Sequence, residues 1–355
     1  MKITIILLLL AFGGLTNVTA SDIAGTERGR QPQITCDERG DVHVVYGSGD
    51  EIFYLKSKDG GKLFTATVVV AKISHLMPGM RRGPRIAVIN NVILVTVPSA
   101  DLLSFVSRDG GTLWSKAGRV NDKDNAAREG LHNIVTIPNA GFFATWLDGR
   151  NVKTEIWGAI SADGIHWDHN RLIYHSPNGS VCECCHPSVA VSLNGDLTVM
   201  WRNSKEGSRD MFFVKSRDYG VTFSNAAKLG PGTWKLNACP MDGGSLALYD
   251  DGRLLSVWRR DGSLYSSSSE RDETQLANGA QPVVTISRGV PITSWSSNNT
   301  IYLKRDVKPP TAIGQGNYPC LSSDSKTGDA FAVWESKAEQ STVQFSRIDT
   351  QGRNL

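Results

Sequence analysis

Four copies of one short motif recur along the chain. They are SKDGGKLF at residues 57–64, SRDGGTLW at residues 107–114, the shorter SADGIHW at residues 161–167 and SRDYGVTF at residues 216–223. Each has a serine, an aspartate two positions later, then glycine, and ends on an aromatic residue. One such peptide would carry little information, but four at intervals of about fifty residues indicate a structural unit repeated along the chain.

The composition of the motif explains what it does. Serine and aspartate side chains can hydrogen-bond the backbone of a turn, and glycine permits the positive φ that such turns require. The terminal aromatic side chain is expected to fold under the turn and pack into a sheet. We therefore interpret the motif as a hairpin turn with a structural role, and its aspartates as structural rather than catalytic residues.

A second repeat supports the first. Seven segments alternate apolar and polar residues and follow turns rich in Gly, Asn or Asp, at residues 42–46, 92–97, 142–146, 197–201, 254–258, 290–295 and 330–334. Alternation between such turns is typical of strands, and no segment has a convincing helical stripe. With the motif placed between the third and fourth strands, each repeat reads as a four-stranded antiparallel blade. The fold class predicted is all-β, a β-propeller.

Seven alternating segments favour seven blades, the last three without a recognisable copy of the motif. Six blades remain the alternative if the short fifth to seventh repeats merge. The segment after residue 334 has room for only three strands of the last blade, so the chain following Ser21 is expected to supply its outer strand and close the ring.

The N-terminus has the pattern of an export signal. Lys2 precedes an apolar run at residues 3–12 that is too short to span a bilayer, and small residues at positions 18–20 suit cleavage. We expect a signal peptide at residues 1–20, one propeller domain at residues 21–355, and a periplasmic or extracellular location. No later stretch is apolar enough for a membrane span, and a net charge of +3 does not favour nucleic acid.

The repeated motif resembles the Asp box, or BNR repeat, of the sialidase (neuraminidase) superfamily of β-propellers. The resemblance covers most of the mature chain and specifies the fold better than the activity, since one fold hosts many functions. It implies a glycoside hydrolase of the exo-alpha-sialidase type. In that family three arginines hold the substrate carboxylate, an aspartate is the acid/base, and a tyrosine activated by a glutamate is the nucleophile.

Some family positions have counterparts here. Arg85, in the sequence PRIA at residues 84–87, is similar to the first family arginine, and Arg202 fits the second. The third is similar to Arg259 or Arg260. Asp101 stands in the loop where the resemblance places the acid/base.

Other family positions depart from the pattern. His186 occupies the place of the glutamate, and Gln281 the place of the nucleophilic tyrosine. Tyr265 is the available substitute, although it lies on a different strand of its blade. These departures leave it open whether the protein is an enzyme. A non-catalytic propeller that binds a glycan or a protein is the alternative.

Propeller geometry places the irregular loops on the face opposite the Asp boxes, and these loops are rich in arginine. The arginines are Arg81, Arg82, Arg85, Arg128, Arg150, Arg202, Arg209, Arg259 and Arg260. Guanidinium groups bind carboxylate or sulfate through paired hydrogen bonds, although each could instead neutralise a local acid. The partner predicted is an anionic carbohydrate such as a sialylated or uronic-acid glycan. The substrate-binding candidates are Arg85, Arg150, Arg202, Arg209, Arg259 and Arg260. The oligomeric state is left open.

Four of the six cysteines fall in two neighbouring loops of this face. Cys182, Cys184 and Cys185 precede His186, and Cys239 lies in the next such loop. We expect no cofactor if these cysteines form disulfides, which export favours. The alternative is a Zn or Cu site built from the four thiols and the imidazole.

The other two cysteines occupy equivalent positions at the two ends of the ring. Cys36 and Cys320 fall on the first strands of the first and last blades. A disulfide between them would lock the ring closure.

Overall fold

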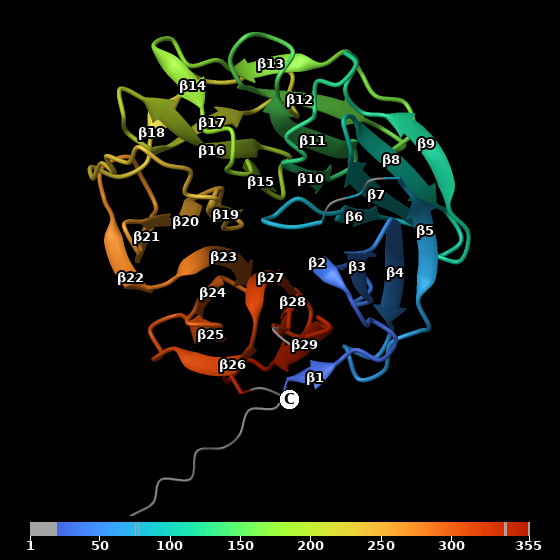
Figure 1. Ribbon diagram of the computed structural model, residues 1–355. Coiled ribbons are helices and arrows are strands. Elements are labelled where there is room, and N and C mark those ends of the chain that lie inside the picture. The colour runs from blue at the N-terminus through green and yellow to red at the C-terminus, as the bar shows by residue number, and fades with distance from the viewer. Residues whose placement is uncertain (1–19, 75, 77, 337–338, 354–355) are drawn as a thin grey trace, which may run out of the picture.

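The computed structural model describes residues 20–74, 76, 78–336 and 339–353. Residues 1–19 of the predicted export signal lie outside this range. The described chain contains strands and no helix, and hence no helix that could span a membrane. Seven antiparallel sheets are arranged as blades around a central axis, which is the β-propeller predicted (Figure 1).

The first four blades follow one another along the chain, each numbered from the axis outward. Blade 1 consists of β2 (Arg30–Cys36), β3 (Val42–Ser48), β4 (Glu51–Ser57) and β5 (Val68–Lys72). Blade 2 consists of β6 (Arg85–Ile89), β7 (Val92–Pro98), β8 (Leu102–Ser107) and β9 (Ser115–Arg119). Blade 3 consists of β10 (His132–Ile137), β11 (Gly141–Asp148), β12 (Glu155–Ser161) and β13 (Arg171–Tyr174). Blade 4 consists of β15 (Ser188–Val191), β16 (Leu197–Lys205), β17 (Met211–Ser216) and β18 (Ala227–Lys228), with β14 (Gly179–Val181) added to β16.

The last three blades lack the regular Asp box but keep the four strands. Blade 5 consists of β19 (Ser245–Leu248), β20 (Leu254–Arg260), β21 (Ser263–Ser267) and β22 (Thr274–Asn278). Blade 6 consists of β23 (Ala280–Ser287), β24 (Val290–Ser297), β25 (Thr300–Arg305) and β26 (Thr311–Gln315). Blade 7 consists of β27 (Asn317–Ser323), β28 (Ala330–Glu335), β29 (Val343–Ile348) and β1 (Ser21–Asp22).

The sequence predictions for the blades are confirmed. The seven alternating segments are the second strands of the seven blades, and the four Asp boxes join third strands to fourth strands. Seven blades form, so the six-blade alternative is wrong. The short late repeats do not merge because each retains its own complete ladder of strand pairs.

The Asp boxes are held by the hydrogen bonds that their composition predicts. The Ser57 hydroxyl donates to Asp59 at 2.7 Å and accepts from the Gly61 amide at 2.8 Å. The Asp59 carboxylate accepts from the Leu63 amide at 3.0 Å. The same pattern recurs at Ser107, Ser161 and Ser216, so the motif satisfies its own tight turn.

The aromatic residue of each Asp box packs against the preceding blade. Phe64 lies edge-on to Phe345 of blade 7, with ring centroids 5.0 Å apart. Trp114 of blade 2 contacts Tyr54 of blade 1, and Phe223 of blade 4 contacts Phe143 of blade 3. The motif therefore joins neighbouring blades as well as closing a hairpin.

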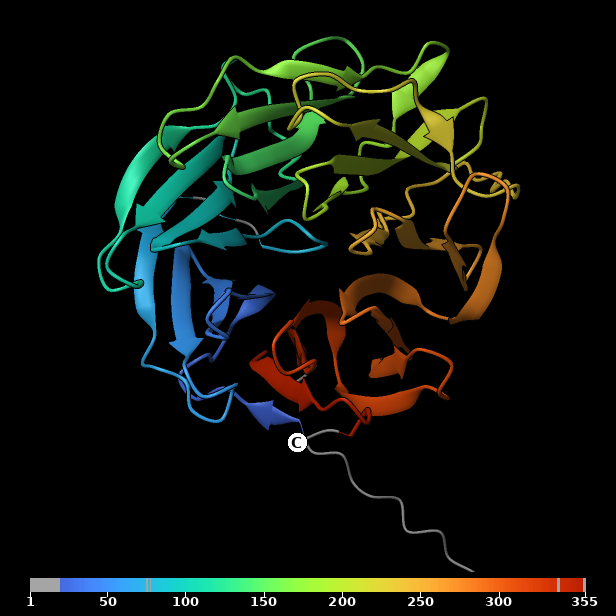
Figure 2. The same cartoon turned by 180° about the vertical axis from the view of Figure 1, so that it is seen from behind.

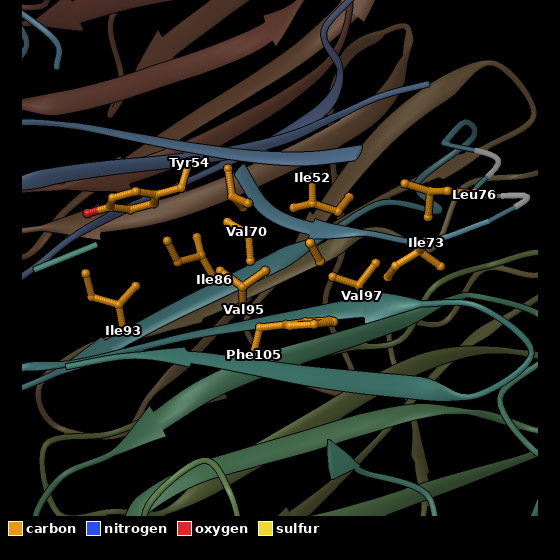
Figure 3. Packing of buried hydrophobic residues seen from close by; sticks show 12 residues of the cluster. Ile52, Tyr54, Val70, Ile73, Leu76, Ile86, Ile93, Val95, Val97 and Phe105 are labelled. Carbon is orange, nitrogen blue, oxygen red and sulfur yellow. The ribbon is translucent and has the colours of Figure 1, made fainter. Parts of the chain in front are cut away.

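Apolar side chains fill the space between blades. Figure 3 shows one such interface, in which Ile52 and Val70 of blade 1 face Ile86, Val95 and Phe105 of blade 2. The alternation along each strand points one set of side chains toward each neighbouring blade, so both faces of a blade are buried.

The N-terminal segment closes the ring, as predicted. Strand β1 pairs antiparallel with β29, and the first and last blades meet there (Figures 1 and 2). The Ile23 amide donates to the Val343 carbonyl at 3.0 Å. The Thr26 hydroxyl donates to the Ile23 carbonyl at 2.7 Å and accepts from the Val343 amide at 3.1 Å. The last blade is thus built from both ends of the described chain.

Candidate functional site

The loops that join second to third strands, and one blade to the next, emerge on the face opposite the Asp boxes. We call it the loop face. Three inner strands begin there with a left-handed residue before proline: Gln31, Gln281 and Tyr318 have φ of 51°, 55° and 57°. Each coincides with a shift in strand register. Left-handed backbone is costly for residues other than glycine and clusters at functional sites, so it directs attention to this face.

One loop crosses the axis on this side. The segment between β5 and β6, which we call the strap (residues 78–84), reaches toward the centre of the ring (Figure 1). Arg81, which is buried, extends from the strap to blades 6 and 7. Its guanidinium donates to the Gln281 side chain at 2.8 Å and to the Pro319 carbonyl at 3.0 Å. Arg81 therefore ties the strap to the opposite blades.

Arg85, the first arginine implied by the resemblance, holds this strap through hydrogen bonds to its backbone. It is 3% exposed, and its guanidinium donates to the carbonyls of Arg81, Gly83 and Pro84. Burial lowers the pKa of Arg85 to about 10. The side chain is engaged with backbone and is not presented to a ligand on the loop face.

Arg202, the second implied arginine, is also a buried backbone clamp. It is 1% exposed and donates to the carbonyls of Asp242, Arg209 and Arg259 at 3.0, 2.6 and 2.9 Å. The carbonyls of Arg209 and Asp242 belong to loops, and that of Arg259 to strand β20 of blade 5. Arg202 therefore fixes the boundary between the two blades.

The other arginine candidates for the substrate have local partners. Arg150 is paired with Asp148 and Asp122 and stacks on Trp157 at 3.7 Å. Burial lowers the pKa of Arg150, but its hydrogen bond to Asp148 and the charges of Asp148 and Asp122 outweigh this, so the net shift is upward. The guanidinium is thus engaged by blade 3 and by the loop that leads into it.

Arg260 and Tyr265 form a unit on the outer part of blade 5. Arg260 is paired with Glu273 and lies over the Tyr265 ring at 3.9 Å. The Tyr265 ring also stacks on Trp258, with ring centroids 6.3 Å apart. Tyr265, the substitute nucleophile, is therefore sandwiched between its neighbours on one blade.

Arg209 and Arg259 lie at the boundary of blades 4 and 5. The Arg209 guanidinium donates to the Leu236 carbonyl at 3.4 Å and to Cys182 Sγ at 3.7 Å. Arg259 lies over the Trp234 ring at 5.9 Å. Arg209 therefore belongs to the surroundings of the cysteine cluster described below.

The remaining catalytic candidates are Asp101 and His186. The Asp101 carboxylate accepts from the Asn121 side chain and the Asn125 amide, both at 2.7 Å, so it organises its own loop. His186 is buried, and burial, followed by the charges of Arg81 and Arg85, lowers the pKa of its imidazole well below the usual value. Asp101, His186 and Tyr265 belong to three different blades, and the structure does not bring them together at one open site.

An open pocket of about 930 Å³ does lie on the loop face, over blades 1, 2 and 7. Its polar lining includes three arginines from separate segments, Arg30, Arg82 and Arg128. Tyr318 contributes an aromatic ring, and Met80 of the strap an exposed apolar side chain. We call it the arginine pocket.

The charge of the arginine pocket is only partly neutralised. Arg128 makes no hydrogen bond or ion pair within the described ranges and is exposed. The Arg82 guanidinium donates to the Glu129 carbonyl at 2.7 Å, and its Nη2 lies 3.9 Å from the Glu129 carboxylate. Arg30, half exposed, lies 3.9 Å from Glu335. Three guanidinium groups facing two carboxylates leave a net positive pocket.

The carboxylate of Glu335 is set below the surface beside this pocket. It accepts from the Gln31 amide and from the Gln31 side chain at 2.8 Å. Burial raises the pKa of Glu335. Burial, followed by the charge of Glu335, raises the pKa of Tyr318. A tyrosine and a glutamate are thus close enough to influence each other at the rim of the pocket.

The sequence predicted only some of the residues of this pocket. Arg82 and Arg128 belong to the predicted arginine-rich loops, whereas Arg30 and Tyr318 were missed. The signal for Tyr318 is the repeated X–Pro opening of inner strands, in which Tyr318–Pro319 occupies the place that Gln281–Pro282 has in the preceding blade.

The cysteine cluster on the same face is compact. The sulfurs of Cys182, Cys184 and Cys185 lie 3.4 to 4.0 Å apart, and all three side chains are buried. Hydrogen bonds with the other two thiols lower the pKa of Cys182 to about 3. Cys239 is exposed, and its interaction with Cys184 raises its pKa to about 11. The loops that carry the four cysteines therefore meet, as expected.

His186 does not join this cluster in the structure. The group of possible metal ligands in this part of the described chain consists of Cys182, Cys184 and Cys185, without His186. The His186 ring faces Gly243 instead, whose position would bring an added Cβ within 2.8 Å of the imidazole Nδ1.

The predicted bridge between Cys36 and Cys320 is not formed in the structure, where all six cysteines are free. The Cys36 amide donates to the Ser322 hydroxyl at 2.9 Å. Cys320 Sγ accepts from the Gln33 side chain at 2.9 Å. The two strands lie side by side, but their register sets each cysteine opposite another residue.

Comparison with solved structures identifies the fold. An intramolecular trans-sialidase from Ruminococcus gnavus is 12% identical, with 96% of this chain and 98% of that chain covered and a TM-score of 0.52. The polysaccharide lyase family PL25 ulvan lyase, bound to -[GlcA(1-4)Rha3S]-, is 8% identical, covered at 92% and 95%, with a TM-score of 0.59. YCF48 bound to D1 peptide is 12% identical, covered at 94% and 96%, with a TM-score of 0.54.

The chain therefore has the fold of the sialidase-like propellers. No protein-family model matches its sequence, and no curated protein matches it significantly. At these identities the likeness shows the fold alone.

Proposed function

We propose that the arginine pocket binds an anionic glycan, with the carboxylate or sulfate of a sugar held by Arg30, Arg82 and Arg128. The observation that carries the proposal is the convergence of three incompletely paired guanidinium groups on one pocket. Guanidinium groups suit this task because they form paired, charge-assisted hydrogen bonds with planar anions.

The other residues of the pocket fit a sugar ring. The Tyr318 ring and the Met80 side chain offer apolar surface beside the charges. A pocket of about 930 Å³ is within the range of small-ligand sites, which combine apolar walls with a few polar groups. One charged sugar can thus be oriented by its anionic group and held by contact with its ring.

The solved structures of the same fold support this class of ligand by analogy. One is a trans-sialidase, and another was solved with a glycan that contains glucuronate and a sulfated rhamnose. A third is bound to a peptide, so protein recognition is the other use of this fold to test. Export, predicted from residues 1–20, would place the protein where such glycans occur.

Glycoside cleavage is a second candidate, and a specific observation favours testing it. Tyr318 lines the pocket, and the charge of Glu335 acts on it. The two are the residue types that the sialidase resemblance assigns to nucleophile and activating base. Because burial and Glu335 raise the pKa of Tyr318, the phenol would need to lose its proton to that carboxylate during attack. Binding does not depend on this step.

The test is calorimetric titration with 3′-sialyllactose, an oligogalacturonate, a sulfated uronate oligosaccharide and a neutral oligosaccharide of matched length. We expect binding of one or more anionic sugars and none of the neutral sugar. The double variant Arg82→Gln and Arg128→Gln should weaken binding at least about tenfold, consistent with the loss of charge-assisted hydrogen bonds.

Arg108→Gln is the matched control, because Arg108 is exposed on the Asp-box face. It should bind as the unaltered protein does. Equal binding of the neutral sugar, or an unchanged affinity in the double variant, would overturn the proposal. Turnover of a fluorogenic sialoside that disappears in Tyr318→Phe, with binding retained, would support the second candidate.

A further inference from the structure

Three thiols converge in the loop between β14 and β15, on the opposite side of the loop face from the arginine pocket. Cys182 Sγ lies 3.6 Å from Cys184 Sγ and 3.4 Å from Cys185 Sγ, and the last two are 4.0 Å apart. A metal–sulfur distance of about 2.3 Å places the sulfurs of a thiolate site about 3.8–4.0 Å apart. The cluster is close to the geometry of a metal site.

The backbone holds this arrangement in place. The Cys185 amide donates to the Cys182 carbonyl at 3.3 Å, which closes a tight turn over four residues. The Cys182 amide donates to the Arg202 carbonyl at 2.9 Å. Strand β14, which leads into the turn, pairs with the end of β16. The three thiols are thus gathered on a turn that is anchored to its blade.

The surroundings suit a complex with negative charge. The Arg209 guanidinium lies 3.7 Å from Cys182 Sγ, and the charge of Arg202 acts on Cys185. Positive side chains are not needed around three neutral thiols, but they offset the charge of three thiolates around one cation. Met241 packs against the cluster and adds a soft thioether to its wall.

We propose that Cys182, Cys184 and Cys185 bind one monovalent copper ion, Cu⁺, through three thiolate sulfurs. Soft thiolate and thioether groups select Cu⁺, Zn²⁺ or iron–sulfur clusters. A structural Zn²⁺ site takes four ligands. Here the candidate group holds three buried sulfurs, and Cys239, although it interacts with Cys184, is exposed and is not one of the group. Three-coordinate binding is usual for Cu⁺, and ligation releases the protons of the thiols.

The experiment uses the mature protein, reduced and kept without oxygen. Cu⁺ is titrated against a chromogenic Cu⁺ chelator as competitor, and X-ray absorption of the loaded protein counts the sulfur neighbours. We expect one equivalent of Cu⁺ with three sulfur ligands. Cys184→Ser and Cys185→Ser should each weaken Cu⁺ affinity by more than the about 10- to 100-fold cost of losing a supporting contact.

Cys36→Ser is the matched control and should leave the stoichiometry and affinity unchanged. Cys239→Ser removes the exposed thiol beside Cys184 and should still bind one Cu⁺ with three sulfur neighbours. Near-ultraviolet circular dichroism establishes that each variant is folded. Failure of the reduced, unaltered protein to compete for Cu⁺ would overturn the proposal. So would four-sulfur binding of Zn²⁺ that is lost in Cys239→Ser, or a protein in which a disulfide within the cluster resists reduction while the fold is intact.

Discussion

The Trp114 indole, at the end of the second Asp box, lies edge-on to the Tyr54 ring of the preceding blade, with centroids 5.2 Å apart. The indole nitrogen also donates to the Gly111 carbonyl at 3.1 Å, within its own turn. One side chain thus closes a hairpin and joins two blades. The turn and the blade interface should be stabilised together.

We predict that Trp114→Ala lowers the free energy of unfolding by about 2–3 kcal/mol, less than a fully buried aromatic residue would, since the indole is partly exposed. Leu113→Ala is the matched control, because Leu113 is in the same turn but 74% exposed. Urea denaturation followed by fluorescence measures both. Equal losses in the two variants would contradict a joining role for Trp114.

Arg202 is predicted to act on stability. Arg202→Ala leaves the carbonyls of Asp242, Arg209 and Arg259 without their donor in a buried position, so we expect a loss of at least about 3 kcal/mol in the free energy of unfolding. Chemical denaturation checks this, beside the exposed Arg217→Ala. If the Arg202→Ala protein is instead stable but has lost glycan binding, Arg202 is a glycan-binding residue and this prediction is wrong.

Two of the buried histidines, His132 and His186, should make stability depend on pH. The pKa values of His132 and His186 are lowered, mainly by burial, so both are neutral in the folded protein. The unfolded chain takes up protons below about pH 6.5, so the free energy of unfolding should fall with decreasing pH. Each histidine contributes a slope of about 1.4 kcal/mol per unit.

The variant His132→Gln isolates this effect. It should reduce the slope between about pH 6.5 and pH 5 by about half. Burial raises the pKa of Glu335, so its protonation stabilises the folded state as the pH falls, which is the opposite effect. This effect is the same in both proteins. His166→Gln, at an exposed position, serves for comparison. Denaturation curves at several pH values measure the slopes, and a slope that is unchanged in His132→Gln would refute the prediction.

Ring closure through the N-terminal strand should contribute to the stability of the whole propeller, so that truncating one side chain there lowers the free energy of unfolding. Ile23 is 5% exposed and packs with Val343 and Phe345 of the last blade. Ile23→Ala should cost about 2–4 kcal/mol in the free energy of unfolding. Val307→Ala, at an 85% exposed position, should cost little. Thermal unfolding compares them, and an Ile23→Ala protein as stable as the control would show that closure does not depend on this contact.

The blades could be predicted because their signals are local. The Ser57–Asp59 turn makes its hydrogen bonds within seven residues, from Ser57 to Leu63, so its sequence predicts its structure. Strand alternation is local as well. The missing fourth strand of the last blade also made the closure by the segment after Ser21 predictable, since a strand edge needs a partner.

The candidate site could not be predicted in the same way. Arg85 and Arg202 are arginines in the expected loops, and nothing in their local sequence shows that backbone carbonyls surround them. Arg202 holds a carbonyl 57 positions away in the chain. Whether a guanidinium group meets a carbonyl or a ligand depends on how distant loops pack.

The sequence by itself determined the all-β class, the blade as the repeating unit and the position of the Asp boxes, because turn chemistry and strand alternation act between near neighbours. Only the tertiary structure decided which arginines stay open. Arg30 and Tyr318 come from opposite ends of the described chain, and the closed ring sets them around one pocket with Arg82. The arrangement of these side chains depends on contacts between blades, and no local sequence pattern encodes such contacts.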